Sequence, residues 1–566
     1  MALSRKLMIV LVISALLSLG SFAAHASSFT SAPQNPEFAA FQQKDSVTKA
    51  MVSPTGMHLG YRPFPLDLSH VSQPSQGFFA TSSPAALPAQ YDLRNYNLMT
   101  AVRNQDPYGT CWSFGGFASL ESTLKKSGGS NHDFSEWHLA YYVYQDFSSS
   151  LPAFTTHTVA PGEDPIFDQG GNSWQAAALL ARWTGAVNET ARPYPGVSPW
   201  PESSRPQTSD PVSNHLEHVY YLPDQDRWDS PLVRDTIKNA LMSYGAVSIR
   251  MLWDNTAYNA ATFSYYNPSS TGGGHIVAIA GWDDNYSAAN FGTAPASNGA
   301  WLVKNSWGTA WGDEGYFWIS YMDPTLASPA VFIGASTSNF DNIYQYDPLG
   351  WTNAIGSGTD TGWFANIFSA NGSGTTPSTI SPSATAELLK AVSFYAAQSS
   401  ATYRIEVRTG VTAGSPASGT LANATEGTLT AAGYHTVRLS SDVALPNGGL
   451  FSIIVRLTTP GYDFPIPVEE PLTGYSDKAR ANAGESYVSN NGGATWQDIT
   501  SVYRANANVC LKAFTSTGTA PSPTPPTPTP GSGSGGGGCS VGAGATIPAV
   551  LLLMIPLAML LKRSSR

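Results

Sequence analysis

The chain has 566 residues, enough for several domains, and only 12% of them are charged, with a formal net charge of -10. No long basic run interrupts this acidic balance, so nucleic acid is not an expected partner. The three cysteines, Cys111, Cys510 and Cys539, are too few for a disulfide framework.

The N-terminus has the features of a secretory signal peptide. Arg5 and Lys6 precede an apolar run at residues 7–19, and small residues end this stretch at Ala26. A membrane anchor is the alternative interpretation, but the run is short for a membrane span. We predict a signal peptide over residues 1–26 and export of the chain.

Residues 27–86 differ in composition from the region that follows them. They are rich in Pro, Ser and Gln, and their apolar positions are scattered. Such a segment cannot form a stable domain alone, so it must pack against another part of the chain.

The main domain is predicted over residues 87–339, where aromatic and aliphatic residues are dense. Apolar spacing and capping residues predict helices over 111–124, from 135, over 174–183 and over 234–244. Short strands are predicted at 247–252, 276–281, 301–304 and 315–321. Helices followed by strands indicate an α+β domain with two lobes and a cleft between them.

A second domain is predicted over residues 342–515, where strand-like alternation indicates an all-β sandwich. Its predicted strands lie at 391–396, 403–408, 435–439, 450–457 and 486–489. Cys510 is expected to be a buried small hydrophobe. Four aromatic side chains could stack on sugars, although core packing is the favoured role: Trp351, Trp363, Tyr462 and Trp496.

The C-terminal end has the composition of a linker and an anchor. Residues 516–538 form a Pro/Thr and then Gly/Ser linker, and residues 539–566 contain Cys539, an apolar run and a basic tail. This end resembles the Cys-containing C-terminal sorting signals of bacterial surface proteins, which are cut and can be lipidated. A plain transmembrane anchor is the alternative. Both predict retention at the cell surface, through a membrane contact of this segment.

Cys111 stands where a Gly-containing loop ends and the first predicted helix begins. The unsatisfied N–H groups and positive dipole end of a helix N-terminus lower the pKa of a thiol and favour the nucleophilic thiolate. A reactive thiol needs a base and a group that orients the base. Among ten histidines, His275 stands at the mouth of a predicted strand, and Asn305 follows it in the run Lys304-Asn305-Ser306-Trp307.

These motifs, in this order, resemble the papain family of cysteine peptidases over about residues 87–325. The resemblance implies a helical lobe and a β-barrel-like lobe. It also implies that Cys111 is the nucleophile, His275 the base and Asn305 the residue that orients the imidazole. Gln105 then contributes to the oxyanion hole, and Trp307 shields the His–Asn hydrogen bond from water.

The resemblance implies substrate contacts as well. Gly170 and Gly171 match the strip whose backbone binds an extended peptide. Gly274 and Arg250 are expected near the pocket for the second residue before the scissile bond. Tyr108 stands where the family usually has a cysteine, so the loop before Cys111 must be held by packing instead of a disulfide.

Two further expectations concern the surroundings of the cleft. By its position, segment 27–86 resembles a propeptide that occupies the cleft until it is removed. The enlarged loop at residues 283–299 is expected beside the active site.

The sequence therefore predicts an exported, surface-tethered cysteine endopeptidase, made as a zymogen, that cleaves protein or peptide substrates as a monomer. Its sandwich resembles the lectin-like domains of bacterial members and could bind surface glycans. No Cys/His cluster has metal-ligand spacing, so neither a metal nor another cofactor is predicted. The alternative function is a surface adhesin that uses the peptidase fold as a non-catalytic scaffold.

Overall fold

The computed structural model describes residues 29–43, 56, 58–72, 87–155, 167, 169–223, 230–370 and 387–518. The predicted signal peptide, nearly all of the predicted linker, and the C-terminal segment 539–566 lie outside the described residues. Within the described residues, no helix combines the length and the apolar character needed to cross a membrane.

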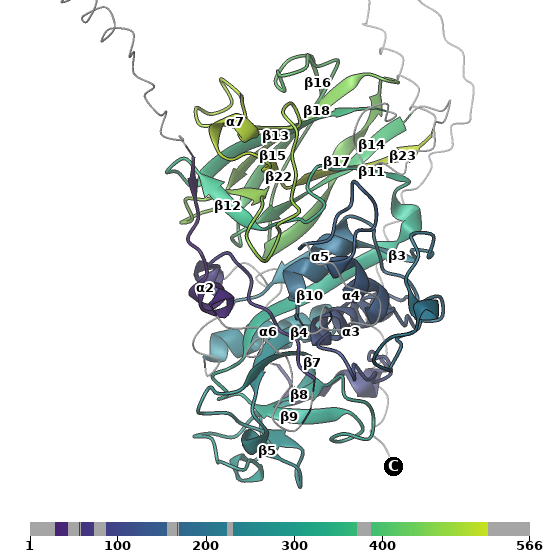
Figure 1. Ribbon diagram of the computed structural model, residues 1–566. Helices are drawn as coiled ribbons and strands as arrows, with labels where there is room; N and C mark the ends of the chain where they lie inside the picture. Colours follow the sequence, from purple (N-terminus) through teal and green to yellow (C-terminus); the bar gives the residue numbers. More distant parts are fainter. Residues whose placement is uncertain are drawn as a thin grey trace, which may run out of the picture. The chain divides into compact units, whose positions relative to one another are not determined.

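Within residues 87–339, three helices pack on one another, and two of them also pack on strands of the sheet described below (Figure 1). Two of the three helices begin at a side-chain cap, because the Ser135 side chain accepts a hydrogen bond from the His138 N–H and the Asn172 side chain accepts one from the Gln175 N–H. Thr110, before the helix that begins at Cys111, makes no such bond. A further helix begins at a proline and packs on β4 and β7. The α-helices of this region are α3 (Cys111–Lys126), α4 (Glu136–Tyr144), α5 (Ser173–Ala181) and α6 (Pro231–Ser243).

The strands of the same region form one twisted sheet in the order β3-β10-β4-β7-β8-β9-β6-β5, and β2 pairs with β7. All pairs are antiparallel except β6 with β9. Their bounds are β2 (Gln90–Asp92), β3 (Asn214–Tyr221), β4 (Val247–Trp253), β5 (Tyr258–Asn259), β6 (Ser264–Tyr265), β7 (Gly273–Asp283), β8 (Ala300–Lys304), β9 (Tyr316–Ser320) and β10 (Ala327–Ser336). The predicted helices and strands are all present, and β2, β3, β5, β6 and β10 are additional.

The C-terminal region is all-β apart from the short helix α7 (Ile499–Val502), as predicted. One of its sheets has the order β16-β15-β18-β13-β20-β21, and its inner face packs on β14 and β17 around buried aliphatic and aromatic side chains. The strands are β11 (Asn342–Tyr344), β12 (Asn353–Gly356), β13 (Thr361–Ser369), β14 (Glu387–Ala396), β15 (Thr402–Thr409), β16 (Thr420–Thr428), β17 (Ala432–Leu445), β18 (Leu450–Thr458), β19 (Ile466–Glu469), β20 (Ser486–Ser489), β21 (Gln497–Asp498), β22 (Asn508–Val509) and β23 (Leu511–Thr517).

The two regions share a sheet, which the sequence did not predict. β17 pairs antiparallel with β3, so the strands β11, β23, β14 and β17 continue the sheet of the first region. The register places Tyr434 opposite Val219 and His435 opposite His218. The sandwich is therefore joined to the first region by backbone hydrogen bonds as well as by side-chain packing.

The described residues before residue 73, which we call the N-terminal segment, pack on both regions. The segment contains β1 (Thr30–Ser31) and α2 (Pro36–Gln42), and β1 pairs antiparallel with β12. Phe38, Tyr61 and Phe64 belong to the same hydrophobic cluster as Cys111 and Trp351. The segment thus depends on the rest of the chain for its packing, as its composition predicts.

The loop at residues 283–299 lies at the opposite end of β7 from His275, which corrects the expectation that it flanks the active site. Asp283 lies eight positions further along this extended strand than His275, a span of roughly 26 Å. The loop instead contacts the start of the domain, because Asp284 accepts a hydrogen bond from Lys238 and its N–H donates to the Ala89 carbonyl.

Short 3₁₀ helices complete the described structure. They are η1 (Ser69–Ser72), η2 (Leu93–Tyr96), η4 (Glu202–Ser204), η5 (Asn255–Ala257), η6 (Ala288–Asn290) and η7 (Thr337–Asn339).

Candidate active site

The structure brings Cys111, His275 and Asn305 together where the start of α3 meets β7 and the end of β8. Cys111 Sγ accepts a hydrogen bond of 3.2 Å from the backbone N–H of Ile276, the residue after His275. The Nε2 atom of His275 lies 2.8 Å from Asn305 Oδ1. The Nδ1 atom has no hydrogen-bond partner among the described residues.

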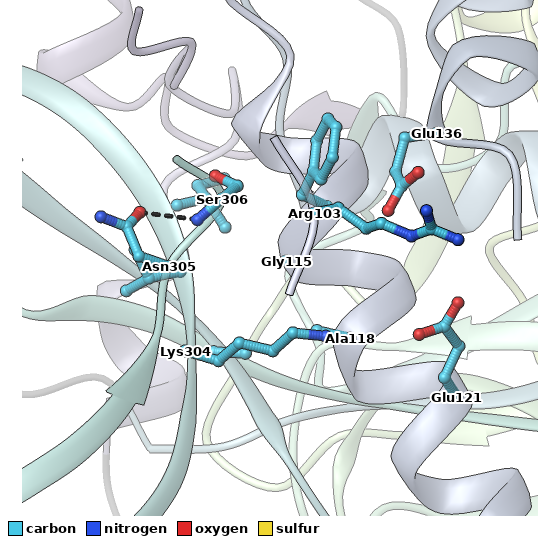
Figure 2. Close-up of a pocket in the computed structure, with 12 residues that line it drawn as sticks. Arg103, Gly115, Ala118, Glu121, Glu136, Lys304, Asn305 and Ser306 are labelled. Atoms are coloured by element: carbon cyan, nitrogen blue, oxygen red, sulfur yellow. Dashed lines mark hydrogen bonds between the residues drawn. The ribbon is translucent and has the colours of Figure 1, made fainter. Parts of the chain in front are cut away.

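The hydrogen bonds of Asn305 determine the tautomer of His275. Asn305 Oδ1 also accepts the backbone N–H of Ser306 at 2.8 Å, an interaction drawn in Figure 2. Only the amide oxygen can accept from a backbone N–H, so the same oxygen faces His275 and the imidazole must donate from Nε2. The other ring nitrogen, Nδ1, is then the one able to accept a proton.

Gln105 is held by Ser306, a residue whose role the sequence did not predict. Ser306 donates from Oγ to Gln105 Oε1 at 2.6 Å, and the Gln105 N–H donates to the Ser306 carbonyl at 2.8 Å. These bonds turn the Gln105 Nε2 donor away from Ser306. The only sequence feature that points to this role is the position of Ser306 directly after Asn305.

The N-terminal segment occupies this site. Gln105 Nε2 donates to the carbonyl oxygen of Leu59 at 3.0 Å and also to the Tyr108 carbonyl. The Trp307 indole donates to the His58 carbonyl at 3.1 Å and stacks on His275 with ring centroids 4.7 Å apart. The segment therefore covers Gln105 and Trp307, two of the residues predicted to belong to the active site.

The predicted peptide-binding strip contacts the same segment through its backbone. Gly171 accepts the Arg62 N–H and donates to the Gly60 carbonyl, both at 2.8 Å. A Cβ at Gly171 would lie 2.5 Å from Trp112, so only glycine fits beneath the segment. The carbonyl of Gly170 accepts the Tyr144 hydroxyl instead, so the backbone contacts come from Gly171.

Tyr61 fills a pocket beside Gly274. The Gly274 carbonyl accepts the N–H groups of Gly60 and Tyr61, and a Cβ at Gly274 would lie 2.6 Å from the Tyr61 ring. The Arg250 guanidinium lies over that ring, 5.1 Å from its centroid, and forms an ion pair with Glu37. Both residues predicted near this pocket thus contact the side chain that fills it.

Burial changes the ionisation of the pair in this closed arrangement. It raises the pKa of the Cys111 thiol to about 12, against the smaller opposite effect of the Ile276 N–H. It lowers the pKa of His275 to about 4, despite the bond to Asn305. The expectation of a lowered thiol pKa is wrong for this arrangement, because loss of hydration outweighs the helix N-terminus.

A small cavity of about 20 Å³ lies behind the site, between α3 and the end of β8 (Figure 2). Glu121 on α3 accepts the Thr100 hydroxyl and the Phe134 N–H, and Lys304 donates to Thr100 at 3.1 Å. Burial raises the pKa of Glu121 and lowers the pKa of Lys304. This network links the helix that begins at Cys111 with the strand that leads to Asn305.

The loop from Gln105 to Cys111 is held by packing around Tyr108. The Tyr108 side chain is fully buried, its hydroxyl donates to the Val197 carbonyl at 2.7 Å, and its ring lies against Trp137 and Phe167. Both cysteines of the described residues, Cys111 and Cys510, are free and buried. Within that part of the chain, His, Cys, Asp and Glu side chains form no group of three suited to a metal ion.

Two family models match the chain. The papain family cysteine protease model matches residues 87–328, and the lectin-like domain model matches residues 343–515. Curated relatives agree with the first match. The senescence-specific cysteine protease SAG39 of Oryza sativa is 26% identical over 233 residues, and papain of Carica papaya is 24% identical over 233 residues. These alignments cover 41% of this chain but only 57% and 55% of the two relatives.

Solved structures match across both regions. The cysteine protease and lectin-like domains of Cwp84, a surface layer associated protein of Clostridium difficile, have a TM-score of 0.67 and 26% identity. That match covers 87% of this chain and 99% of the other. Cwp84 after propeptide cleavage has a TM-score of 0.61 and 29% identity, covering 76% and 99%. The chain thus carries a papain-family cysteine protease domain followed by a lectin-like domain.

Proposed function

We propose that this chain is a cysteine endopeptidase that hydrolyses peptide bonds through Cys111, His275 and Asn305. The observation that carries the proposal is the position of the Leu59 carbonyl. Its oxygen accepts a hydrogen bond from the side-chain amide of Gln105, the donor that would bind the carbonyl oxygen of a substrate.

The proposed reaction begins when the N-terminal segment leaves. Rehydration lets the proton of Cys111 move to Nδ1 of His275, and the thiolate attacks the substrate carbonyl carbon. Gln105 Nε2 and the Cys111 N–H donate to the oxyanion. His275 then protonates the leaving amine, and water hydrolyses the thioester with His275 as base. Asn305 keeps the imidazole in the tautomer whose Nδ1 faces this chemistry.

The N-terminal segment is proposed to be the propeptide of a zymogen. Its support is the occupation of the Gln105 and Gly171 donors and the burial of Cys111. Removal of residues 27–86 should therefore switch the enzyme on. Equal activity of the chain with and without this segment would contradict a zymogen.

A location at the cell surface is proposed from the tail at residues 539–566 and from the similarity to Cwp84, whose structure is described as that of a surface layer associated protein. Cleavage and lipidation at Cys539 would give a defined mass for the mature C-terminus. Glycan binding by the lectin-like domain would assist retention. Trp351 and Tyr462 are buried in the described structure, so they are not free sugar platforms there.

An epoxysuccinyl thiol-protease inhibitor tests the proposed activity. After removal of the N-terminal segment it should label the protein and stop peptide cleavage, and both effects should vanish in Cys111→Ala. Cys510→Ala is the matched control, since Cys510 is also buried and free but lies in the lectin-like domain. A folded, processed protein that neither labels nor cleaves would favour the adhesin.

A further inference from the structure

Phe64 of the N-terminal segment is enclosed by aromatic rings from two domains. Its ring stacks on Trp174 with centroids 4.3 Å apart and meets the rings of Trp351 and Tyr475 at 6.0 and 6.2 Å. Phe64 is only 2% exposed. We call Trp174, Trp351 and Tyr475 the aromatic pocket.

The aromatic pocket adjoins the peptide-binding strip. Trp174 belongs to α5, whose cap Asn172 directly follows Gly171. The Asn172 amide donates to the Arg62 carbonyl at 3.1 Å and to the Tyr475 hydroxyl at 3.2 Å. A side chain of the lectin-like domain is therefore hydrogen-bonded to the residue that extends the strip.

Tyr475 makes further contacts with the N-terminal segment. The Arg62 guanidinium lies over its ring, 5.3 Å from the centroid, and Phe38 meets the ring edge-on at 5.7 Å. The Gln42 side chain donates to the Thr473 carbonyl of the same loop. When the segment leaves, this loop and Trp351 lose their contacts with Phe38, Gln42 and Phe64.

We propose that the aromatic pocket is a substrate subsite that selects an aromatic or large apolar side chain upstream of the scissile bond. The lectin-like domain thereby supplies specificity-determining residues to the protease domain. This inference rests on the proposed peptidase function and extends it.

A peptide side chain is the favoured occupant, because a peptide side chain fills the aromatic pocket in the structure. The backbone that carries Phe64 is bound by the Gly171 and Asn172 groups that would bind a substrate. Burying an aromatic ring in such a pocket is worth about a ten- to hundredfold gain in binding. A sugar ring is the alternative occupant, and inhibition by oligosaccharides, measured below, distinguishes it from a peptide side chain.

The test uses the full chain after removal of residues 27–86. Two peptide series carry Phe or Ala at each position from three to six residues before the scissile bond, and kcat/KM is measured for both. We expect Phe to be preferred about tenfold or more at one position. In Trp351→Leu and Tyr475→Leu that ratio should fall toward one, whereas Trp363→Leu, on β13 of the lectin-like domain, should keep it.

A second measurement does not depend on the folding of these variants. A peptide of residues 58–68 should inhibit the processed wild-type enzyme, and its Phe64→Ala form should inhibit about tenfold more weakly. Equal cleavage of the Phe and Ala series would overturn the subsite. Competitive inhibition of Phe-peptide cleavage by hexose or N-acetylhexosamine oligosaccharides would overturn it in favour of a glycan site. Loss of all cleavage and of Cys111 labelling would instead contradict the peptidase function.

Discussion

At the scale of single residues, the ionisation of Cys111 depends on what covers it. Backbone N–H groups favour the thiolate of Cys111: those of Cys111 and Trp112 at the start of α3 and that of Ile276 on β7 all lower the pKa of this thiol. Burial beneath the N-terminal segment has the larger, opposite effect and raises the pKa of this thiol to about 12. The helix start therefore makes Cys111 reactive only where water or a charged partner reaches it.

We predict that alkylation of Cys111 by iodoacetamide is slow in the full chain and fast after removal of residues 27–86. With the thiol pKa near 12, only about one thiol in ten thousand is ionised at pH 8. The rate in the full chain should rise about tenfold per pH unit up to pH 9, and the processed form should react already near pH 6. Mass spectrometry of the peptide that contains Cys111 measures the alkylation rate in each form, and Cys111→Ala serves as the negative control. Identical rates in the two forms would contradict the effect of burial.

At the scale of elements, the loop from Gln105 to Cys111 is held by the Tyr108 ring. We predict that excess dithiothreitol leaves the thermal unfolding of the processed protein unchanged, because Cys111 and Cys510 are both free. Tyr108→Ala should lower the free energy of unfolding by about 3–5 kcal/mol through the cavity it leaves. The matched Tyr108→Phe loses only the bond to the Val197 carbonyl and should cost about 1 kcal/mol. A large reductant effect on wild type would contradict this account.

The elements also show where sequence reasoning succeeds. The helices at Glu136 and Ser173 are predictable because apolar spacing and caps are local signals, and the helix at Cys111 is predictable from its apolar residues. The contacts among Cys111, His275 and Asn305 follow from the family's motifs. The pairing of β3 with β17 joins residues more than 200 positions apart without any motif, so sequence alone does not indicate it. The aromatic pocket escapes prediction for the same reason, since Trp174 and Tyr475 meet only through the tertiary fold.

At the scale of the whole molecule, the β3–β17 junction makes the two domains one packed structure. Tyr434 on β17 is fully buried in a cluster that includes Val219 of β3 and Trp112 beside the candidate nucleophile. His435 lies in the same junction, where Nε2 contacts the Ala431 carbonyl at 3.0 Å and the ring lies near His218 and Tyr220. The junction therefore buries the imidazoles of His435 and His218, and this burial lowers the pKa of both.

Acid should weaken this junction. Burial lowers the pKa of His435 from 6.5 to about 3, with His218 acting in the same direction. Between these values the unfolded chain binds a proton that the folded chain does not, so the free energy of unfolding falls as the pH drops below 6.5. His435 alone accounts for about 2 kcal/mol between pH 7 and pH 5 by this linkage. We expect the free energy of unfolding, measured with urea at pH 7 and pH 5, to differ less between the two pH values in His435→Gln than in wild type. His132→Gln, at a half-buried position on the loop before α4 where burial also lowers the pKa of the imidazole, should reduce the wild-type difference less than His435→Gln does. An unchanged pH difference in His435→Gln would mean that this imidazole is not held neutral by the joined sheet.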